Sequence, residues 1–228
     1  MSHTIVLLPG DGIGPEVAAA ARAVLEAVAP HHGLSLTFES HDIGGCAIDA
    51  HGDPFPETTA KACADAHAVF LGAVGGPKWD GGGPRPEAGL LALRKTLGAF
   101  ANLRPITLFS GLEHLSPLKP ERATGTDMLI VRELTGGIYF GDKVEGDDAA
   151  SDLCSYSRPE VERIARIAFD AARERKGRVT SVDKANVLAT SRLWRKTVIA
   201  LKESDYPDVA LDHVLVDAMA MKLIERPT

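Results

Sequence analysis

The segment 131–141, with the sequence VRELTGGIYFG, places an arginine, a glycine pair and a phenol within one short reach. Arg132 ends the apolar run 128–131, and Tyr139 follows Gly136 and Gly137. A cation buried at the end of a strand is costly unless an anion meets it. We therefore predict that Arg132 contacts a bound anion.

Two further arginines stand upstream, Arg94 in an expected helix and Arg104 beside Pro105. Each is expected beside a chain reversal or at a strand end. The planar fork of an arginine binds a carboxylate through two hydrogen bonds. Three such arginines predict a pocket for a small molecule with more than one carboxylate. Taken singly, Arg94 is equally consistent with a snorkelling residue at a helix end, and Arg104 with a satisfied strand-end residue.

Lys184 and Asp217 each follow an expected strand, at 179–182 and 209–216. A partly desolvated lysine at a strand end can exchange protons, although a surface cap is the simpler interpretation. One carboxylate does not make a divalent-metal site, and Asp217 alone is most typical of a helix N-cap. Tyr139, considered alone, is more typical of a packing residue than of an acid.

The elements that would position these residues alternate between strand and helix, which predicts an α/β fold with a parallel sheet. Strands are expected at 4–8, 34–38 and 68–72, and helices from Pro15 to 29 and over 57–66. The stretch 73–86 reads as a functional loop or a linker. A boundary near Ala99 predicts two domains, 1–99 and 100–228, the second with a projecting arm at 138–156. Ser157 is expected to cap a long helix.

The glycine loop at 10–14 invites comparison with a dinucleotide-binding fingerprint, which it fails because Pro15 stands where a glycine is needed. We interpret it as a tight strand-to-helix turn with positive φ angles.

Composition excludes several classes of protein. The 228 residues are 45% hydrophobic and carry a net charge of −6, which argues against nucleic-acid binding. No apolar run is long enough to span a membrane, and the first residues do not resemble a signal peptide. The three cysteines are far apart, which suits a reducing cytoplasm.

Nine segments, in order along the chain, resemble the isocitrate/isopropylmalate dehydrogenase family, and within it the branch acting on 3-isopropylmalate. They are LPGDGIGPE (8–16), GAVGGPKWD (72–80), RPEAGLLALRK (85–95), FANLRP (100–105), LSPLK (115–119), VRELTGGIYFG (131–141), SVDKANVL (181–188), WRKTV (194–198) and VDAMAM (216–221). The resemblance implies the family's two-domain α/β fold. It also implies oxidative decarboxylation of 3-isopropylmalate, in leucine biosynthesis, by a cytoplasmic homodimer with shared active sites.

The resemblance also implies a role for each site residue. Arg94, Arg104 and Arg132 would bind the substrate, with Tyr139 as general acid and Lys184 of the partner subunit as general base. Asp217 would contact substrate and bind Mg²⁺ or Mn²⁺. The residues expected along NAD are Ile13, Gly75, Gly76, Pro77, Lys78, Glu87 and Asn186. Those expected around the isopropyl group are Leu90, Leu91 and Val187, together with Glu87.

Family members carry two more metal-binding aspartates beyond the position of Thr228. The resemblance therefore implies a fold that is incomplete at the C-terminus, lacking half of the first domain, and a 228-residue chain that is inactive alone. Two alternatives remain: a non-catalytic fragment that only dimerises, and a related dehydrogenase acting on tartrate, malate or isocitrate.

Overall fold

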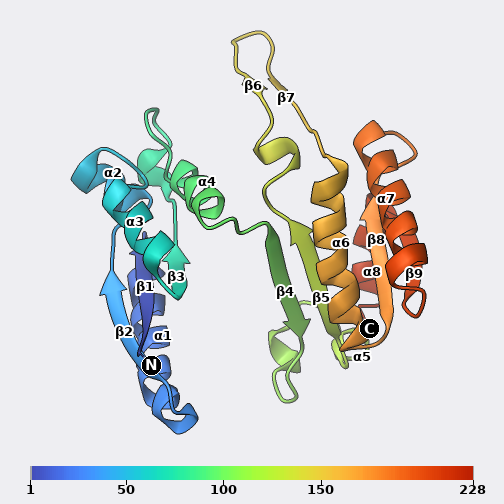
Figure 1. Cartoon of the computed structure of the whole chain (residues 1–228), viewed down its shortest axis with the longest axis horizontal. Coiled ribbons are helices and arrows are strands. Elements are labelled where there is room, and N and C mark those ends of the chain that lie inside the picture. The colour runs from blue at the N-terminus through green and yellow to red at the C-terminus, as the bar shows by residue number, and fades with distance from the viewer. Residues whose placement is uncertain (1, 228) are drawn as a thin grey trace. The chain divides into compact units, whose positions relative to one another are not determined.

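The computed structural model describes residues 2–227. Contacts between Cα atoms divide the chain into two compact units, Met1–Ala99 and Phe100–Thr228, each described here by itself (Figure 1).

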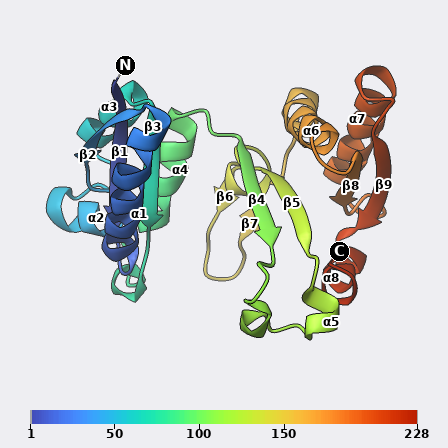
Figure 2. The same ribbon diagram turned by 90° about the horizontal axis from the view of Figure 1, so that it is seen from below.

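The first unit is built on a three-stranded parallel sheet with the order β2-β1-β3. Its strands are β1 (Ser2–Gly10), β2 (Ser35–Ser40) and β3 (Ala68–Ala73). Helix α1 (Gly14–Val28) packs against β1 and β3, followed by the short helix η1 (Ala29–His32) (Figure 2). This arrangement matches the parallel α/β sheet expected from the alternation of apolar strands and helices.

Three more helices complete the first unit: α2 (Gly45–His51), α3 (Glu57–Asp65) and α4 (Pro86–Thr96), with the single turn η2 (Pro77–Trp79) before α4. Cys63 of α3 and Leu93 of α4 join Val6 and Leu8 of β1 in one buried cluster. The core therefore fixes both ends of the loop that joins β3 to α4. Helix α2 was not predicted from the sequence, because it is short and follows a glycine N-cap, Gly44.

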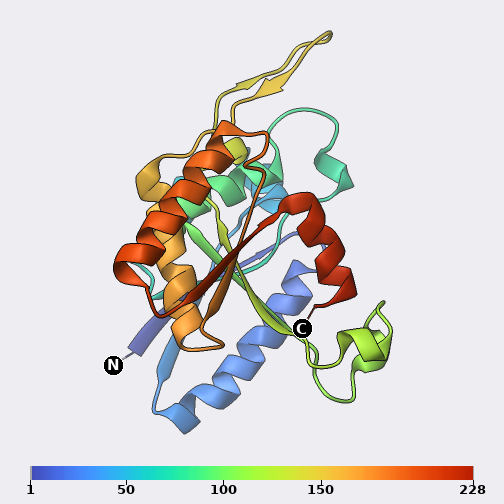
Figure 3. The same cartoon turned by 90° about the vertical axis from the view of Figure 1, so that its right-hand side faces the viewer.

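The described part of the second unit contains three separate strand pairs. β4 (Ala101–Thr107) and β5 (Asp127–Glu133) are antiparallel, and β8 (Arg178–Asp183) and β9 (Ala210–Leu215) are parallel. The link from β4 to β5 contains η3 (Glu113–Leu115) and α5 (Pro120–Ala123), and η4 (Gly137–Tyr139) follows β5. Strands β6 (Lys143–Val144) and β7 (Ser151–Asp152) pair in an arm that projects from this unit (Figure 3).

Helices α6 (Arg158–Arg173) and α7 (Ala189–Asp205) pack against each other and against β8. Their core includes Phe169, stacked on Tyr206 with ring centroids 4.8 Å apart. Helix α6 begins after Ser157, as the sequence predicted, and Ser157 forms a capping box with Glu160, whose carboxylate accepts the Ser157 N–H. The last helix, α8 (Val216–Glu225), follows β9 directly. Within residues 2–227, no helix is both long and apolar enough to cross a membrane.

Candidate active site

One face of the β4–β5 pair carries two of the three predicted arginines. Arg132 of β5 lies opposite Asn102 of β4, and Arg104 stands two residues further along β4. Because side chains alternate along a strand, all three residues point to the same face. Arg104 donates a hydrogen bond from Nε to Oδ1 of Asn102, at 2.5 Å. Asn102 is a site residue that the sequence analysis missed, although its spacing of two from Arg104 would have placed it there.

Tyr139, in the turn that follows β5, lies close to Arg132. The Cζ atom of Arg132 lies 5.2 Å from the centre of the Tyr139 ring, an arrangement typical of a cation–π contact. Tyr139 is 54% exposed, so its hydroxyl is open to a ligand. The structure therefore brings Arg104, Asn102, Arg132 and Tyr139 to one surface.

Two sequence-based expectations about these arginines are wrong. Arg132 is exposed rather than buried, because its face of β5 is open in the described chain. Arg104 lies in the middle of β4 instead of at a strand end. Two exposed guanidinium groups that share one face, and not a costly buried charge, therefore favour an anionic ligand.

The neighbour of Arg132, Glu133, points to the opposite face of β5 and is buried, with 1% of its side chain exposed. Its carboxylate accepts hydrogen bonds from Gly136 N at 2.6 Å and from the Thr135 hydroxyl at 3.0 Å. Arg163 of α6 forms an ion pair with the same carboxylate. The chain reversal between Arg132 and Tyr139 is therefore tied to the covering helix.

Lys184 and Asp217 form a second cluster, at the carboxyl ends of β8 and β9. The Nζ atom of Lys184 donates a hydrogen bond to Oδ1 of Asp217, and this contact lowers the pKa of the Asp217 carboxyl. Asp217 lies in the first turn of α8, whose N-cap is Leu215, so the N-cap interpretation of Asp217 is wrong. The pairing of these two residues comes from the parallel register of β8 and β9, in which Asp183 lies opposite Leu215.

Asn186 and Val187 belong to the turn between β8 and α7, and both are exposed. The Val187 N–H donates to the Lys184 carbonyl at 3.0 Å. Within the described part of the chain, no hydrogen bond or ion pair links the Lys184–Asp217 cluster to the Arg132–Tyr139 cluster.

The first unit holds the residues expected along a dinucleotide. Ile13 is 61% exposed, and Lys78 pairs with Asp49 at 2.5 Å. Gly75 has a φ of +102°, and a Cβ atom there would lie 2.8 Å from Oε1 of Glu87. Only glycine therefore fits this position without strain or displacement of Glu87.

Asp11 holds the loop that contains Gly75 through hydrogen bonds to the backbone. The sequence alone did not identify it as a positioning residue. It is only 4% exposed. Its Oδ2 atom accepts the Gly45 and Gly75 N–H groups, both at 2.8 Å, and its Oδ1 atom accepts the Cys46 N–H at 2.7 Å. Gly10 and Gly12 on either side have positive φ angles, as expected for a tight turn. The position of Asp11 between two such glycines was the available signal.

Helix α4 carries the three remaining candidates, Leu90, Leu91 and Arg94. All three are half-buried, whereas Leu93 between them is buried in the core. Arg94 lies in the last turn of the helix, where a positive charge is favoured by the helix dipole.

The described residues do not form a complete metal site. No group of three or more His, Cys, Asp or Glu side chains in residues 2–227 is arranged to hold a metal ion. Asp217 offers one carboxylate, already hydrogen-bonded to Lys184. A divalent cation such as Mg²⁺ requires more oxygen ligands than this.

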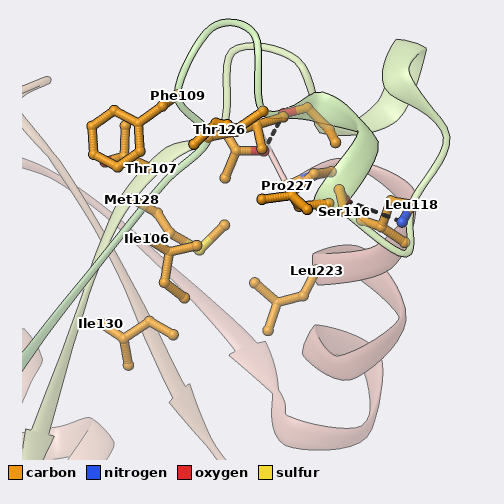
Figure 4. A pocket seen from close by; sticks show the side chains of 14 residues that line it. Ile106, Thr107, Phe109, Ser116, Leu118, Thr126, Met128, Ile130, Leu223 and Pro227 are labelled. Carbon is orange, nitrogen blue, oxygen red and sulfur yellow. Dashed lines mark hydrogen bonds between the residues drawn. The ribbon is translucent and has the colours of Figure 1, made fainter. Parts of the chain in front are cut away.

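An apolar cavity of about 450 Å³ lies beside the arginine face, between β4, β5 and α8. Ile106 and Ile130 extend into it from positions two residues away from Arg104 and Arg132 (Figure 4). Leu223 and Pro227 border it from the other side. None of the described residues lining it is one of the predicted site residues.

The fold and these clusters define an α/β protein with an arginine-rich surface suited to a carboxylate ligand. Residues 4–228 match the family model described as isocitrate/isopropylmalate dehydrogenase, so the chain belongs to that family. All of it aligns, at 55% identity, with a 3-isopropylmalate dehydrogenase of Listeria innocua and with one of Rhodopirellula baltica, covering 65% of each relative.

Solved structures agree with this assignment of the fold. An isocitrate dehydrogenase from Methylococcus capsulatus superimposes with a TM-score of 0.85 at 33% identity, over 99% of this chain and 64% of that protein. A beta-decarboxylating dehydrogenase from Thermococcus kodakarensis gives a TM-score of 0.74 at 33% identity, over 99% of this chain and 61% of that protein. The chain thus spans about two thirds of the length of its relatives.

Proposed function

We propose that this chain belongs to an enzyme that oxidises and decarboxylates 3-isopropylmalate while reducing NAD, a step of leucine biosynthesis in the cytoplasm. Identity of 55% over the whole chain to proteins named 3-isopropylmalate dehydrogenase is the strongest support. The shared face of Arg104, Arg132 and Tyr139 supports the same conclusion independently, because it suits a ligand with more than one carboxylate.

In this proposal, Arg94, Arg104 and Arg132 bind the two carboxylates of the substrate. Asn102 orients Arg104 through the hydrogen bond described above. Leu90, Leu91 and Val187 contact the isopropyl group, whose burial favours binding by roughly 0.8 kcal/mol per methylene.

Lys184 takes the proton of the C2 hydroxyl as hydride leaves C2 for the nicotinamide ring. The carboxylate on C3 then leaves as CO₂, and its bonding electrons form the C2–C3 double bond of an enolate, with the negative charge on the C2 oxygen. Tyr139 protonates C3 to give the keto acid. A phenol and an amine can share this proton traffic when each is within hydrogen-bond reach of the reacting atom.

The NAD molecule, which accepts the hydride, would lie along Ile13, the loop of Gly75, Gly76, Pro77 and Lys78, Glu87 and Asn186. The tight glycine turn and the backbone held by Asp11 support this assignment, since they keep the loop in one conformation. Mg²⁺ or Mn²⁺ would contact Asp217. Because the described residues supply only that one ligand, no step is assigned to the metal.

The proposed active unit is a homodimer in which Lys184 and Asp217 act on the substrate bound by the other subunit. The projecting arm supports association, because Val144 and Leu153 are 62% and 53% exposed on it. Exposed apolar side chains on a protruding element are typical of an interaction surface.

Formation of NADH from 3-isopropylmalate with Mn²⁺, measured on the enzyme that contains this chain, tests the function directly. Isocitrate, malate and tartrate serve as competing substrates in the same assay. We expect 3-isopropylmalate to be turned over with the highest kcat/KM. A preference for isocitrate would contradict the proposal, and sedimentation of this chain as a monomer would contradict the homodimer.

A further inference from the structure

Two buried carboxylates each stand next to a proposed site residue in the sequence and have matching environments. Glu133 follows Arg132 at the end of β5, and Asp183 precedes Lys184 at the end of β8. Only 1% and 2% of their side chains are exposed. Burying a charged carboxylate is costly unless it is paired and hydrogen-bonded, so each must be compensated locally.

Glu133 is compensated by the turn that leads to Tyr139 and by helix α6. Gly136 N and the Thr135 hydroxyl donate to it from the turn. Arg163 pairs with it from α6, and also donates to the Thr135 hydroxyl at 2.6 Å. The Arg163 guanidinium is in turn held 4.6 Å above the centre of the Phe100 ring.

Asp183 repeats this arrangement at the other cluster. The Ala185 N–H donates to its Oδ1 atom at 2.9 Å, from the turn that carries Lys184. Arg195 of α7 binds both carboxylate oxygens, through Nε at 2.9 Å and Nη2 at 2.8 Å. Two-point binding of this kind fixes the orientation of the carboxylate as well as its position.

Both carboxylates therefore join three parts: a strand end, the turn that carries a reactive side chain, and the helix packed behind that strand. Neither contacts the open face where Arg104 and Arg132 lie, because each points to the helix side of its strand. Their geometry suits the support of a site rather than contact with a ligand.

We propose that Glu133 and Asp183 are positioning residues, the first fixing the turn that places Tyr139 over Arg132, the second fixing the turn that presents Lys184. Their catalytic effect rests on the proposed function, whereas their effect on the two turns does not. Reacting groups displaced by about 1 Å can cost on the order of 10²-fold in rate.

Backbone amide hydrogen exchange in this chain tests the two turns without any substrate. Glu133→Gln and Asp183→Asn keep the side-chain shape and remove the charge. We expect Glu133→Gln to accelerate exchange at the Gly136 amide about tenfold or more while leaving the Ala185 amide unchanged, because a hydrogen bond to a charged group is lost at one turn only. Asp183→Asn should give the reverse pattern.

Leu201→Ala is the matched control, because Leu201 is buried in the α6–α7 core and belongs to neither turn. It should lower the stability of the second unit and accelerate hydrogen exchange to the same extent at the Gly136 and Ala185 amides. If Glu133→Gln or Asp183→Asn also changes both amides alike, the carboxylates act only on general stability and the inference is wrong. If Glu133→Gln or Asp183→Asn does not fold, Thr135→Val and Arg195→Lys provide milder replacements. They weaken the hydrogen bonds to Glu133 and to Asp183, respectively.

Steady-state kinetics provide the second test. With 3-isopropylmalate and NAD, Asp183→Asn should lower kcat about 10²-fold with little change in KM, since Lys184 moves protons without binding carboxylates. Glu133→Gln should also raise KM, because Arg132 is next to it. An unchanged kcat in both variants would contradict the proposed catalytic effect of Glu133 and Asp183. Absence of turnover in the unmodified enzyme that contains this chain would count against the proposed function, and the exchange pattern would still decide whether the carboxylates fix the turns.

Discussion

The guanidinium of Arg132 lies over the ring of Tyr139, with 5.2 Å between Cζ and the ring centre. The two residues are seven positions apart, joined by a turn with a positive φ of +74° at Gly137. A Cβ atom at Gly137 would lie 2.3 Å from the Tyr156 hydroxyl. The close approach of a binding residue and a proton donor thus depends on a glycine.

Replacing Tyr139 by phenylalanine separates its two contributions. The ring that supports Arg132 remains, and only the hydroxyl is lost. We expect kcat for 3-isopropylmalate to fall about 10²- to 10⁴-fold, the usual contribution of a general acid, with KM nearly unchanged. Tyr139→Leu, which removes the ring as well, should also raise KM. NADH formation measures both constants, and an unaltered kcat in Tyr139→Phe would exclude Tyr139 as the acid.

Arg132→Lys keeps the positive charge but removes the planar fork. A lysine cannot bind a carboxylate through two parallel hydrogen bonds. We expect KM for 3-isopropylmalate to rise about tenfold or more, the effect of one lost charge-assisted hydrogen bond. Arg175→Lys is the control, since Arg175 pairs with Asp127 at the other end of β5. Equal KM values for both variants would argue against carboxylate binding by Arg132.

Leu90→Ser tests the pocket proposed for the isopropyl group. An apolar contact of this size is worth about 1–3 kcal/mol in discrimination, so KM for 3-isopropylmalate should rise about tenfold or more. Malate lacks the branch, and its KM should not change. Parallel increases for both substrates would indicate that helix α4 has been disturbed and would count against the pocket.

Asp11→Asn should loosen the loop that includes Gly75. The carboxylate accepts three N–H groups, and an amide would turn its own NH₂ group toward at least one of them. An unsatisfied buried donor costs about 1–3 kcal/mol, so we expect KM for NAD to rise by about tenfold. Asp53→Asn, at a turn where Asp53 accepts the Phe55 N–H, is the control. Identical KM values for NAD in the two variants would refute a role for Asp11 in this loop.

Asp208 links stability of the second unit to pH. Hydrogen bonds from Arg173 lower the pKa of its carboxyl from 3.8 to about 2. Because the folded pKa lies below the unfolded one, the stabilisation is complete above about pH 4 and disappears as pH falls toward 2. Urea unfolding between about pH 5 and pH 3 should show a shallower loss of stability in Asp208→Asn than in the unmodified chain. Asp147→Asn, in the exposed loop between β6 and β7, should behave like the unmodified chain.

The sequence predicted most of the regular elements because local signals marked them. Short apolar runs and apolar alternation identified the strands, and Ser157 with Glu160 marked the start of α6. Short elements were missed: α2 and α5 have seven and four residues, too few for a helical period to emerge. Whether Ala99 separates two domains with distinct roles stays a prediction.

The sequence by itself determined the family, through nine segments in a fixed order, and with it the residue types of a carboxylate site. Only the tertiary structure decided which of them meet. The register of β4 with β5 placed Asn102 beside Arg104 and opposite Arg132, and the parallel register of β8 and β9 brought Lys184 to Asp217. Strand register depends on backbone hydrogen bonds between distant segments, so local patterns do not encode such pairings. The same long-range packing buried Glu133 and Asp183 against α6 and α7. In the sequence alone, these two residues do not differ from the other acidic residues.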